Sequence, residues 1–124
     1  MTLPLVEASL MTLKVLTFNA SPHMEKSNTT LILDPFLDGL KEEGVSIEIF
    51  YTSQLKINPC PGDLNCWTKT LGKCIQKDDV ETLLPKIRQA NILVFAFPLY
   101  VDGMPGPMKN LVDRLIALLD HTPC

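Results

Sequence analysis

The fold is decided by the stretch LKVLTFNASP at residues 13–22. Its first six residues are apolar or favour β-structure, so we predict a strand over 13–18 that stops at the Asn-Ala-Ser-Pro run. The polar segment 23–28 predicts a loop, and apolar residues at helical spacing predict a helix over 29–43, ended by Gly44. Pro35 inside this helix predicts a kink. Strand, loop and helix in this order form the first unit of an alternating α/β fold.

The alternation continues along the chain. Residues 45–51 predict a second strand, and residues 91–97, nearly all apolar, predict a third strand buried on both faces as in a parallel sheet. Between them lies a long stretch, 52–77, in which Pro and Gly block regular structure. This order predicts a flavodoxin-like, doubly wound parallel α/β sheet with strand order 2-1-3, truncated after its third strand.

Two helices complete the prediction. One starts at Asp78, as a cap with Glu81 three residues later, and runs to about Gln89. The other runs over 105–119, with Pro in its first turn. Its apolar residues offer more surface than three strands cover, so we expect part of it to be exposed; they are Leu111, Val112, Leu115, Ile116, Leu118 and Leu119.

Composition restricts the class of protein. With 124 residues, 46% hydrophobic and 20% charged, the chain is long enough for one folded domain and is not disordered. A net charge of −3 gives no electrostatic basis for binding nucleic acid or an anionic membrane. The start has no basic region typical of a secretion signal, and we expect a cytoplasmic protein. Residues 1–11 are interpreted as an N-terminal extension, with the domain at 12–124.

The loop after the first strand carries the first candidate site. Ser21, Ser27, Asn28 and Thr29 bring hydroxyl and amide groups to the start of a helix, where free N–H groups and the helix dipole favour a phosphate. Without glycine, this loop is neither a dinucleotide fingerprint nor a Walker loop. Hydroxyl-rich loops of this kind hold the phosphate monoester of a mononucleotide. The alternative is an ordinary helix cap followed by a polar turn.

The loop after the third strand carries the second candidate site. Pro98, Leu99, Tyr100 and Val101 follow the strand, and a tyrosine there could pack on a planar heterocycle. In a sheet of order 2-1-3, strands one and three are neighbours, so both loops reach the crevice where this fold class binds ligands. Taken alone, Tyr100 could simply cover the core.

The cysteines form the third feature. Cys60, Cys66 and Cys74 lie within fifteen residues, and Cys124 is the last residue. This content is too low for a secreted disulfide scaffold, so the cluster indicates a metal or redox loop or a family remnant.

Three ordered motifs resemble a known family. They are Ser21-Pro22-x4-Ser27-Asn28-Thr29, the Cys60…Cys66-Trp67…Cys74 stretch with Asp78-Asp79, and Pro98-x-Tyr100 followed by Gly103-Met104 and Asp113-Arg114. Over residues 12–119 the sequence is similar to the flavodoxin-like NADPH-dependent FMN reductases, closest to their iron–sulfur flavoprotein branch. The resemblance implies an FMN-dependent NAD(P)H oxidoreductase that transfers a hydride through the flavin.

The resemblance also assigns residues. It implies that Ser21, Ser27, Asn28 and Thr29 hold the FMN phosphate, and that Pro98, Leu99, Tyr100 and Val101 border the isoalloxazine ring. No catalytic side chain is expected. Lys109, Asp113 and Arg114 match as well, but Lys and Asp four apart form an ordinary helix-surface pair, so we assign these residues to structure.

Two departures limit the resemblance. Relatives have an arginine where this chain has His23, and Lys26 could replace its charge. Relatives with a cluster have four cysteines, whereas here the set is Cys60, Asp63, Cys66 and Cys74. Since iron–sulfur clusters prefer four thiolates, we expect none; zinc could take the same ligands.

The length leaves alternatives open. A flavodoxin-like domain has five strands, and this sequence predicts three. The chain could be an FMN-binding electron carrier without a nicotinamide site, or a truncated, non-enzymatic remnant that folds by association. We expect the apolar third strand, at an edge of the sheet, to pair in a homo-oligomer or with a missing C-terminal part.

Overall fold

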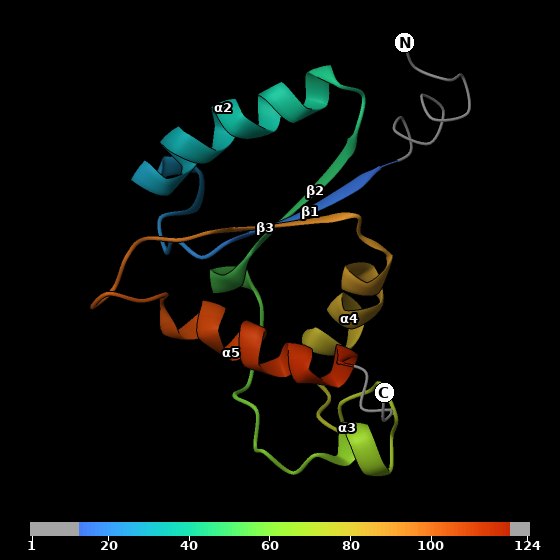
Figure 1. Cartoon of the computed structure of the whole chain (residues 1–124). Helices are drawn as coiled ribbons and strands as arrows, with labels where there is room; N and C mark the ends of the chain where they lie inside the picture. The colour runs from blue at the N-terminus through green and yellow to red at the C-terminus, as the bar shows by residue number, and fades with distance from the viewer. Residues whose placement is uncertain (1–12, 120–124) are drawn as a thin grey trace, which may run out of the picture.

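A computed structural model describes residues 13–119 and contains one parallel sheet (Figure 1). Its strands are β1 (Lys14–Asn19), β2 (Ser46–Tyr51) and β3 (Ile92–Ala96), in the order β2-β1-β3. Both pairings are parallel, and Phe18 of β1 lies in register with Phe50 and Phe95. The predicted fold class and strand order are confirmed.

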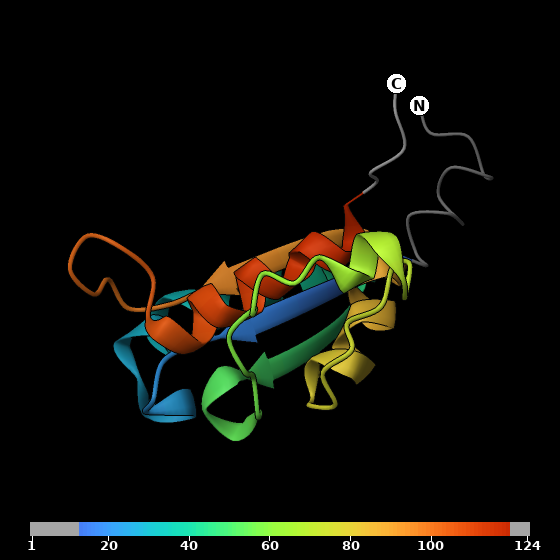
Figure 2. The same cartoon turned by 90° about the horizontal axis from the view of Figure 1, so that it is seen from below.

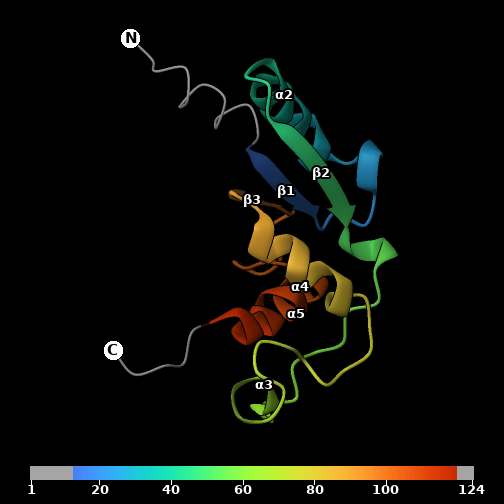
Figure 3. The ribbon, with the colours of Figure 1, turned by 90° about the vertical axis from the view of Figure 1, so that its right-hand side faces the viewer.

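Helices cover both faces of this sheet. Helix α2 (Asn28–Glu42) lies on one face, and α4 (Val80–Gln89) and α5 (Gly106–Arg114) lie on the other (Figures 1 and 3). Seen from below, α5 runs along the strands (Figure 2). Helix α2 continues through Pro35, which lies inside it without ending it.

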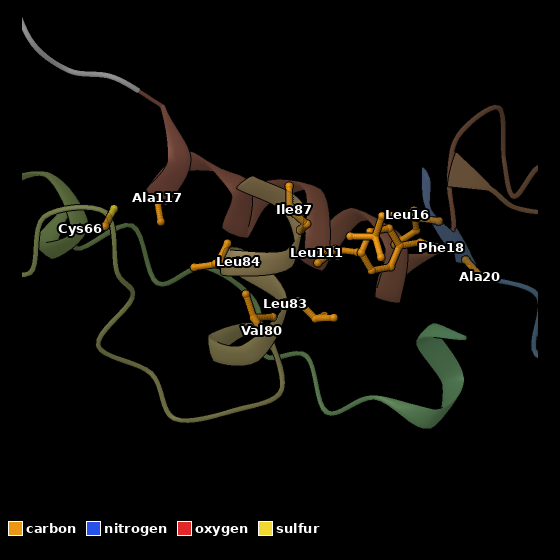
Figure 4. Packing of buried hydrophobic residues seen from close by; sticks show 11 residues of the cluster. Leu16, Phe18, Ala20, Cys66, Val80, Leu83, Leu84, Ile87, Leu111 and Ala117 are labelled. Carbon is orange, nitrogen blue, oxygen red and sulfur yellow. The ribbon is translucent and has the colours of Figure 1, made fainter. Parts of the chain in front are cut away.

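The larger core lies between the sheet and helices α4 and α5. Alternate residues of β1, Leu16 and Phe18, point to this side because successive side chains of a strand face opposite ways. The Phe18 ring is stacked between those of Phe50 and Phe95, with ring centroids 5.9 and 5.8 Å away. The helices add buried apolar side chains to the same cluster, among them Leu83, Leu84 and Leu111 (Figure 4).

The stretch between β2 and α4 is more ordered than predicted. Within 52–77 the structure contains a 3₁₀ turn, η2 (Thr52–Gln54), and one short helix, α3 (Asn65–Thr68).

Another 3₁₀ turn, η1 (Met24–Lys26), lies in the first loop. The last predicted helix is shorter than 105–119, because α5 ends at Arg114 and a 3₁₀ turn, η3 (Leu115–Leu118), follows.

The predicted cap of the helix after the cysteines forms in part: Asp78 Oδ1 accepts from the Val80 N–H at 3.1 Å. Helix α4 begins at Val80, its N-cap residue is Asp79, and that side chain makes no capping hydrogen bond. Asp79 instead accepts from the backbone N–H of Lys56 at 2.6 Å, and the Glu81 carboxylate is paired with Lys77. Glu81 therefore does not take part in the predicted cap, because its carboxylate is paired with Lys77 in the preceding loop.

Two burial predictions also need correction. Strand β3 is not buried on both faces: Ile92 and Leu93 are exposed, because nothing within residues 13–119 covers this edge of the sheet. The apolar residues after Lys109 are better covered than expected, and only Leu119 of the six is exposed. The cysteine-containing loop provides the cover, since the Trp67 indole N–H donates to the carbonyl of Ile116 at 3.0 Å.

Within residues 13–119, no helix is long and apolar enough to cross a membrane. The expected extension at 1–11 and Cys124 lie outside the described residues.

Candidate functional site

The loops after β1 and β3 meet at the carboxyl edge of the sheet, at one end of the molecule in Figure 1. The backbone N–H of Ala20 donates to the carbonyl of Ala96 at 2.8 Å and ties the two loops together. Beside them an open groove of about 560 Å³ runs between α2 and β3. Asn28 and Thr29 line it from the first loop and Pro98 from the second. The structure therefore brings three predicted site residues to one groove.

A buried polar network shapes the first loop. The Asn19 side chain is buried; its Nδ2 donates to Thr30 Oγ1 at 3.0 Å and its Oδ1 accepts from the Ser21 N–H at 2.9 Å. Thr30 Oγ1 donates to the carbonyl of Met24 at 2.6 Å. Asn19 and Thr30 were not among the predicted site residues. The feature of the sequence that indicates them is an asparagine at the end of a buried strand together with a threonine three residues after Ser27.

The two serines predicted to bind phosphate are engaged within the loop. Ser27 is the N-cap of α2: its Oγ accepts from the Thr30 N–H at 3.0 Å and donates to the Met24 carbonyl at 2.7 Å. Ser21 is buried, and its Oγ accepts from the His23 N–H at 3.3 Å. Ser27 therefore acts as an ordinary helix cap, the alternative to a phosphate-binding residue.

Free donors remain at the start of α2. Within residues 13–119, no acceptor takes the backbone N–H groups of Asn28 and Thr29, because the helix leaves its first N–H groups unpaired. Thr29 is half-buried and its hydroxyl has no partner in the same range of residues. Since α2 has fifteen residues, its dipole adds a partial positive charge here. The position is suited to an anion.

A tyrosine lies at the end of β2, near this loop. Burial, followed by the charges of Glu25 and Asp34, raises the pKa of the Tyr51 phenol above its ordinary value. The hydroxyl of Tyr51 therefore stays protonated at neutral pH.

The second loop is a tight hairpin with an unusual backbone. Tyr100 and Gly103 exchange two hydrogen bonds of 2.8 and 3.0 Å, and the two residues between them have positive φ, 47° at Val101 and 61° at Asp102. A β-branched residue in this region is strained, and such strain is concentrated at functional sites. The hairpin holds Leu99, Tyr100 and Val101 exposed, so of the four predicted residues only Pro98 lines the groove.

The predicted cluster residues also lie together. Cys60, Asp63, Cys66 and Cys74 line one hollow of about 10 Å³, with room for about one water. All three of these thiols are free, and Cys66 is buried. Burial first, then the nearby Cys74, Cys60 and Asp63, raises the pKa of the Cys66 thiol. The Asp63 carboxylate accepts from the Asn65 N–H and Nδ2 at 3.3 and 2.9 Å.

A buried ion pair joins this loop to α5. Arg114 donates to both carboxylate oxygens of Asp78, at 2.7 and 3.0 Å, and to the Asn58 carbonyl at 2.9 Å. Burial opposes the charge of Asp78, but hydrogen bonds from Arg114 and from the N–H groups of Asn58 and Val80 lower its pKa. Burial likewise opposes the charge of Arg114, while the hydrogen bond to Asp78 and then the nearby Cys74 raise its pKa. Arg114 is thus structural, and Lys109 and Asp113 form the predicted exposed helix pair.

Residues 13–123 match the family described as NADPH-dependent FMN reductase. The chain belongs to this family.

Curated relatives are similar over about half of their length. An iron–sulfur flavoprotein of Methanocaldococcus jannaschii is 35% identical over 102 residues, which are 82% of this chain and 51% of that protein. An iron–sulfur flavoprotein of Archaeoglobus fulgidus is 34% identical over 102 residues, 82% of this chain and 48% of that protein. This FMN reductase family member therefore spans about half the length of the relatives it matches.

Solved structures support the same fold. RosB with bound 8-demethyl-8-formylriboflavin-5′-phosphate superposes with a TM-score of 0.70 at 24% identity, over 91% of this chain and 45% of that one. The NAD(P)H:quinone oxidoreductase from Methanothermobacter marburgensis gives 0.68 at 23% identity, over 84% and 53%. The flavodoxin-like fold of this FMN reductase family member is confirmed.

The names of the relatives raise the question of an iron–sulfur cluster. Here the hollow between the cysteines holds about one water, and its fourth residue is a carboxylate already bonded to Asn65. In the part of the chain that the structure describes, no three His, Cys, Asp or Glu side chains are arranged to hold a metal ion. These residues, as folded in this FMN reductase family member, do not fit a four-iron cluster.

Proposed function

We propose that this chain binds FMN across the loops after β1 and β3 and acts as an FMN-dependent oxidoreductase that takes a hydride from NAD(P)H. One observation carries the proposal: residues of both loops line a single groove of about 560 Å³ at the carboxyl edge of the sheet. In open α/β sheets, this edge is where ligands bind. Membership of the FMN reductase family supports FMN as the ligand.

The phosphate end lies at the start of α2. The N–H groups of Asn28 and Thr29, the Thr29 hydroxyl and the helix dipole are the donors for a phosphate monoester. Ser21 and Ser27 keep the loop folded through their own hydrogen bonds. We therefore divide the predicted set into residues that contact the phosphate and residues that position them.

The ring end lies at the second loop. Pro98 borders the groove, and the strained hairpin presents Leu99, Tyr100 and Val101 as exposed apolar surface. A flat, largely apolar ring is matched by apolar side chains and a few backbone N–H groups.

FMN, when bound, supplies hydride acceptance and electron transfer, and the protein supplies binding and orientation. None of the eight predicted site residues carries a carboxylate, imidazole or amine, so we assign them binding and orientation and no proton transfer. The name of the M. marburgensis neighbour supports a quinone as one class of electron acceptor.

A flavin absorption spectrum of the purified protein, followed by titration with FMN and riboflavin, tests the proposal. We expect FMN to bind more tightly than riboflavin, and the loaded protein to oxidise NADPH with a quinone present. Absence of FMN binding would overturn the whole proposal. FMN binding without NADPH oxidation would overturn the enzymatic part and favour an electron carrier.

A further inference from the structure

A second cavity, of about 510 Å³, lies away from both flavin loops. It is formed where the stretch 70–77 passes along one face of α4, on the side of the sheet opposite α2 (Figure 3). Helix residues spaced by three and four contribute Glu81, Leu84, Pro85 and Arg88. The volume is within the range of small-molecule pockets, and the cavity shares no residue with the groove beside α2.

The cavity lining is partly apolar. Leu84, Pro85 and Ile75 line it, and Leu84 is buried. Ile75 remains exposed although the loop around it is folded. This surface is suited to an apolar ring or chain.

The rim of the same cavity is cationic. It carries Lys73, Lys77 and Arg88 against one acid, Glu81, whose Oε1 lies 3.0 Å from Lys77 Nζ. Among residues 13–119, no carboxylate lies within 4 Å of the Lys73 or Arg88 cation. Two uncompensated cations therefore face one cavity in a chain with a net charge of −3.

Glycine at position 72 lets Arg88 lie against the loop. A Cβ added to Gly72 would come within 3.1 Å of Arg88 Nη2, and the φ of +76° also favours glycine here. The Arg88 guanidinium thus lies close to the Gly72 backbone, and its side chain is exposed at the cavity. An unpaired guanidinium and an ammonium group lining the same cavity can together recognise a carboxylate, sulfonate or phosphate.

We propose that this cavity binds a small organic anion, with one acidic group on an apolar ring or chain. The anionic group pairs with Arg88 and Lys73, and the apolar part packs on Ile75, Leu84 and Pro85. The proposal does not depend on flavin binding.

Nuclear magnetic resonance of ¹⁵N-labelled protein tests this directly, with 1-naphthalenesulfonate as the probe. We expect saturable shifts of the Gly72, Lys73 and Cys74 amides, and a Kd at least tenfold higher in Arg88→Gln and Lys73→Gln. Lys86→Gln is the matched control, because it removes the same charge from α4 outside the cavity; its Kd should change less than twofold. Uncharged 1-naphthol should bind at least tenfold more weakly than the sulfonate.

Shifts confined to the groove at Asn28, Ile32 and Phe97 would overturn the proposal, as would equal losses of affinity in Arg88→Gln and Lys86→Gln. The amide spectrum of each variant reports whether it is folded, and Ile75→Ser supplies a second, uncharged change at the cavity. We expect Ile75→Ser to weaken the binding of the sulfonate and of 1-naphthol alike; unchanged affinities would contradict the apolar lining assigned to Ile75.

Discussion

At the start of α2, neighbouring hydroxyls have separate roles. Thr29→Ala should weaken FMN binding by about 1.5–3 kcal/mol, the value of a hydrogen bond to a charged group. It should leave riboflavin binding unaffected, because riboflavin has no phosphate. Ser27→Ala removes the N-cap, so it should destabilise the protein by about 1 kcal/mol and weaken the binding of both flavins. Flavin titrations and urea unfolding measure these effects. Equal losses of FMN and riboflavin in Thr29→Ala would remove Thr29 from the phosphate site.

The Asp78–Arg114 pair predicts a pH-dependent stability. Asp78→Asn leaves a buried guanidinium uncompensated and should cost about 3–5 kcal/mol at neutral pH. The pKa of Asp78 is lowered in the folded state, so its contribution is fully present above the unfolded pKa of about 3.9 and is lost as pH falls through the folded value.

Urea unfolding between pH 7 and pH 2 measures the difference between wild type and Asp78→Asn, which should shrink below about pH 4. Asp113→Asn removes the exposed acid of the Lys109 pair and is the control, with an expected cost within about 0.5 kcal/mol. A cost of Asp78→Asn no greater than that of the control would show that the buried pair does not hold the loop.

At the scale of elements, the cysteine-containing loop is folded by its own contacts. We expect aerobically purified protein to contain no stoichiometric iron and free thiols at Cys60, Cys66 and Cys74. Cys66 should react most slowly with a thiol reagent, because it is buried while Cys60 and Cys74 are partly exposed. Metal analysis and timed thiol labelling test this. Anaerobic reconstitution giving four irons per chain would contradict it and make Asp63 a ligand.

The strands could be predicted from sequence almost to the residue, because alternation and apolar runs are local signals. The predicted strand at 13–18 is displaced by one residue from β1, and the predicted strand at 45–51 starts one residue before β2. The hydrogen bond from the Val80 N–H to Asp78 was predictable as a local cap. The pairing of Asp78 with Arg114, 36 positions later, could not be predicted, because it forms only in the folded chain. The burial of the apolar residues after α5 could not be predicted either, because the loop that covers them is remote in sequence.

The candidate site could likewise be predicted only in part. The convergence of the two loops follows from the strand order, which was predicted from the sequence. The roles within the first loop do not, since Asn19 and Thr30 act only once strand and helix lie together.

For the whole molecule, the two edges of the sheet differ. The β2 edge carries Ser46 and Glu48, the latter paired with Lys86, whereas β3 contains only uncharged apolar residues. Unprotected edges of this kind pair with other strands. We propose that the chain self-associates along β3, where Ile92 and Leu93 are exposed, and that the groove beside α2 stays open to FMN.

Sedimentation at low micromolar concentration tests this. Leu93→Lys places a charge on the exposed part of β3 and should shift the protein to monomer. Leu31→Lys places the same charge on α2, at a residue that is 73% exposed and lies away from β3, and should leave the association unchanged. A monomeric wild type with a cooperative melt would show that the edge does not pair.

The link from Asp78 to Arg114 also sets a sequence of events in time. During synthesis the ribosome adds Asp78 first, and 36 further residues, roughly 2–7 seconds of elongation, pass before its partner exists. Until then the carboxylate has no buried counter-charge and stays hydrated, so the preceding loop stays open. We expect the Cys66 thiol to be labelled quickly in nascent chains arrested before Arg114, and slowly in chains released from the ribosome, where Cys66 is buried. Equal labelling rates would contradict this order. Cys66 thus has an early interval of chemical accessibility that ends when α5 docks.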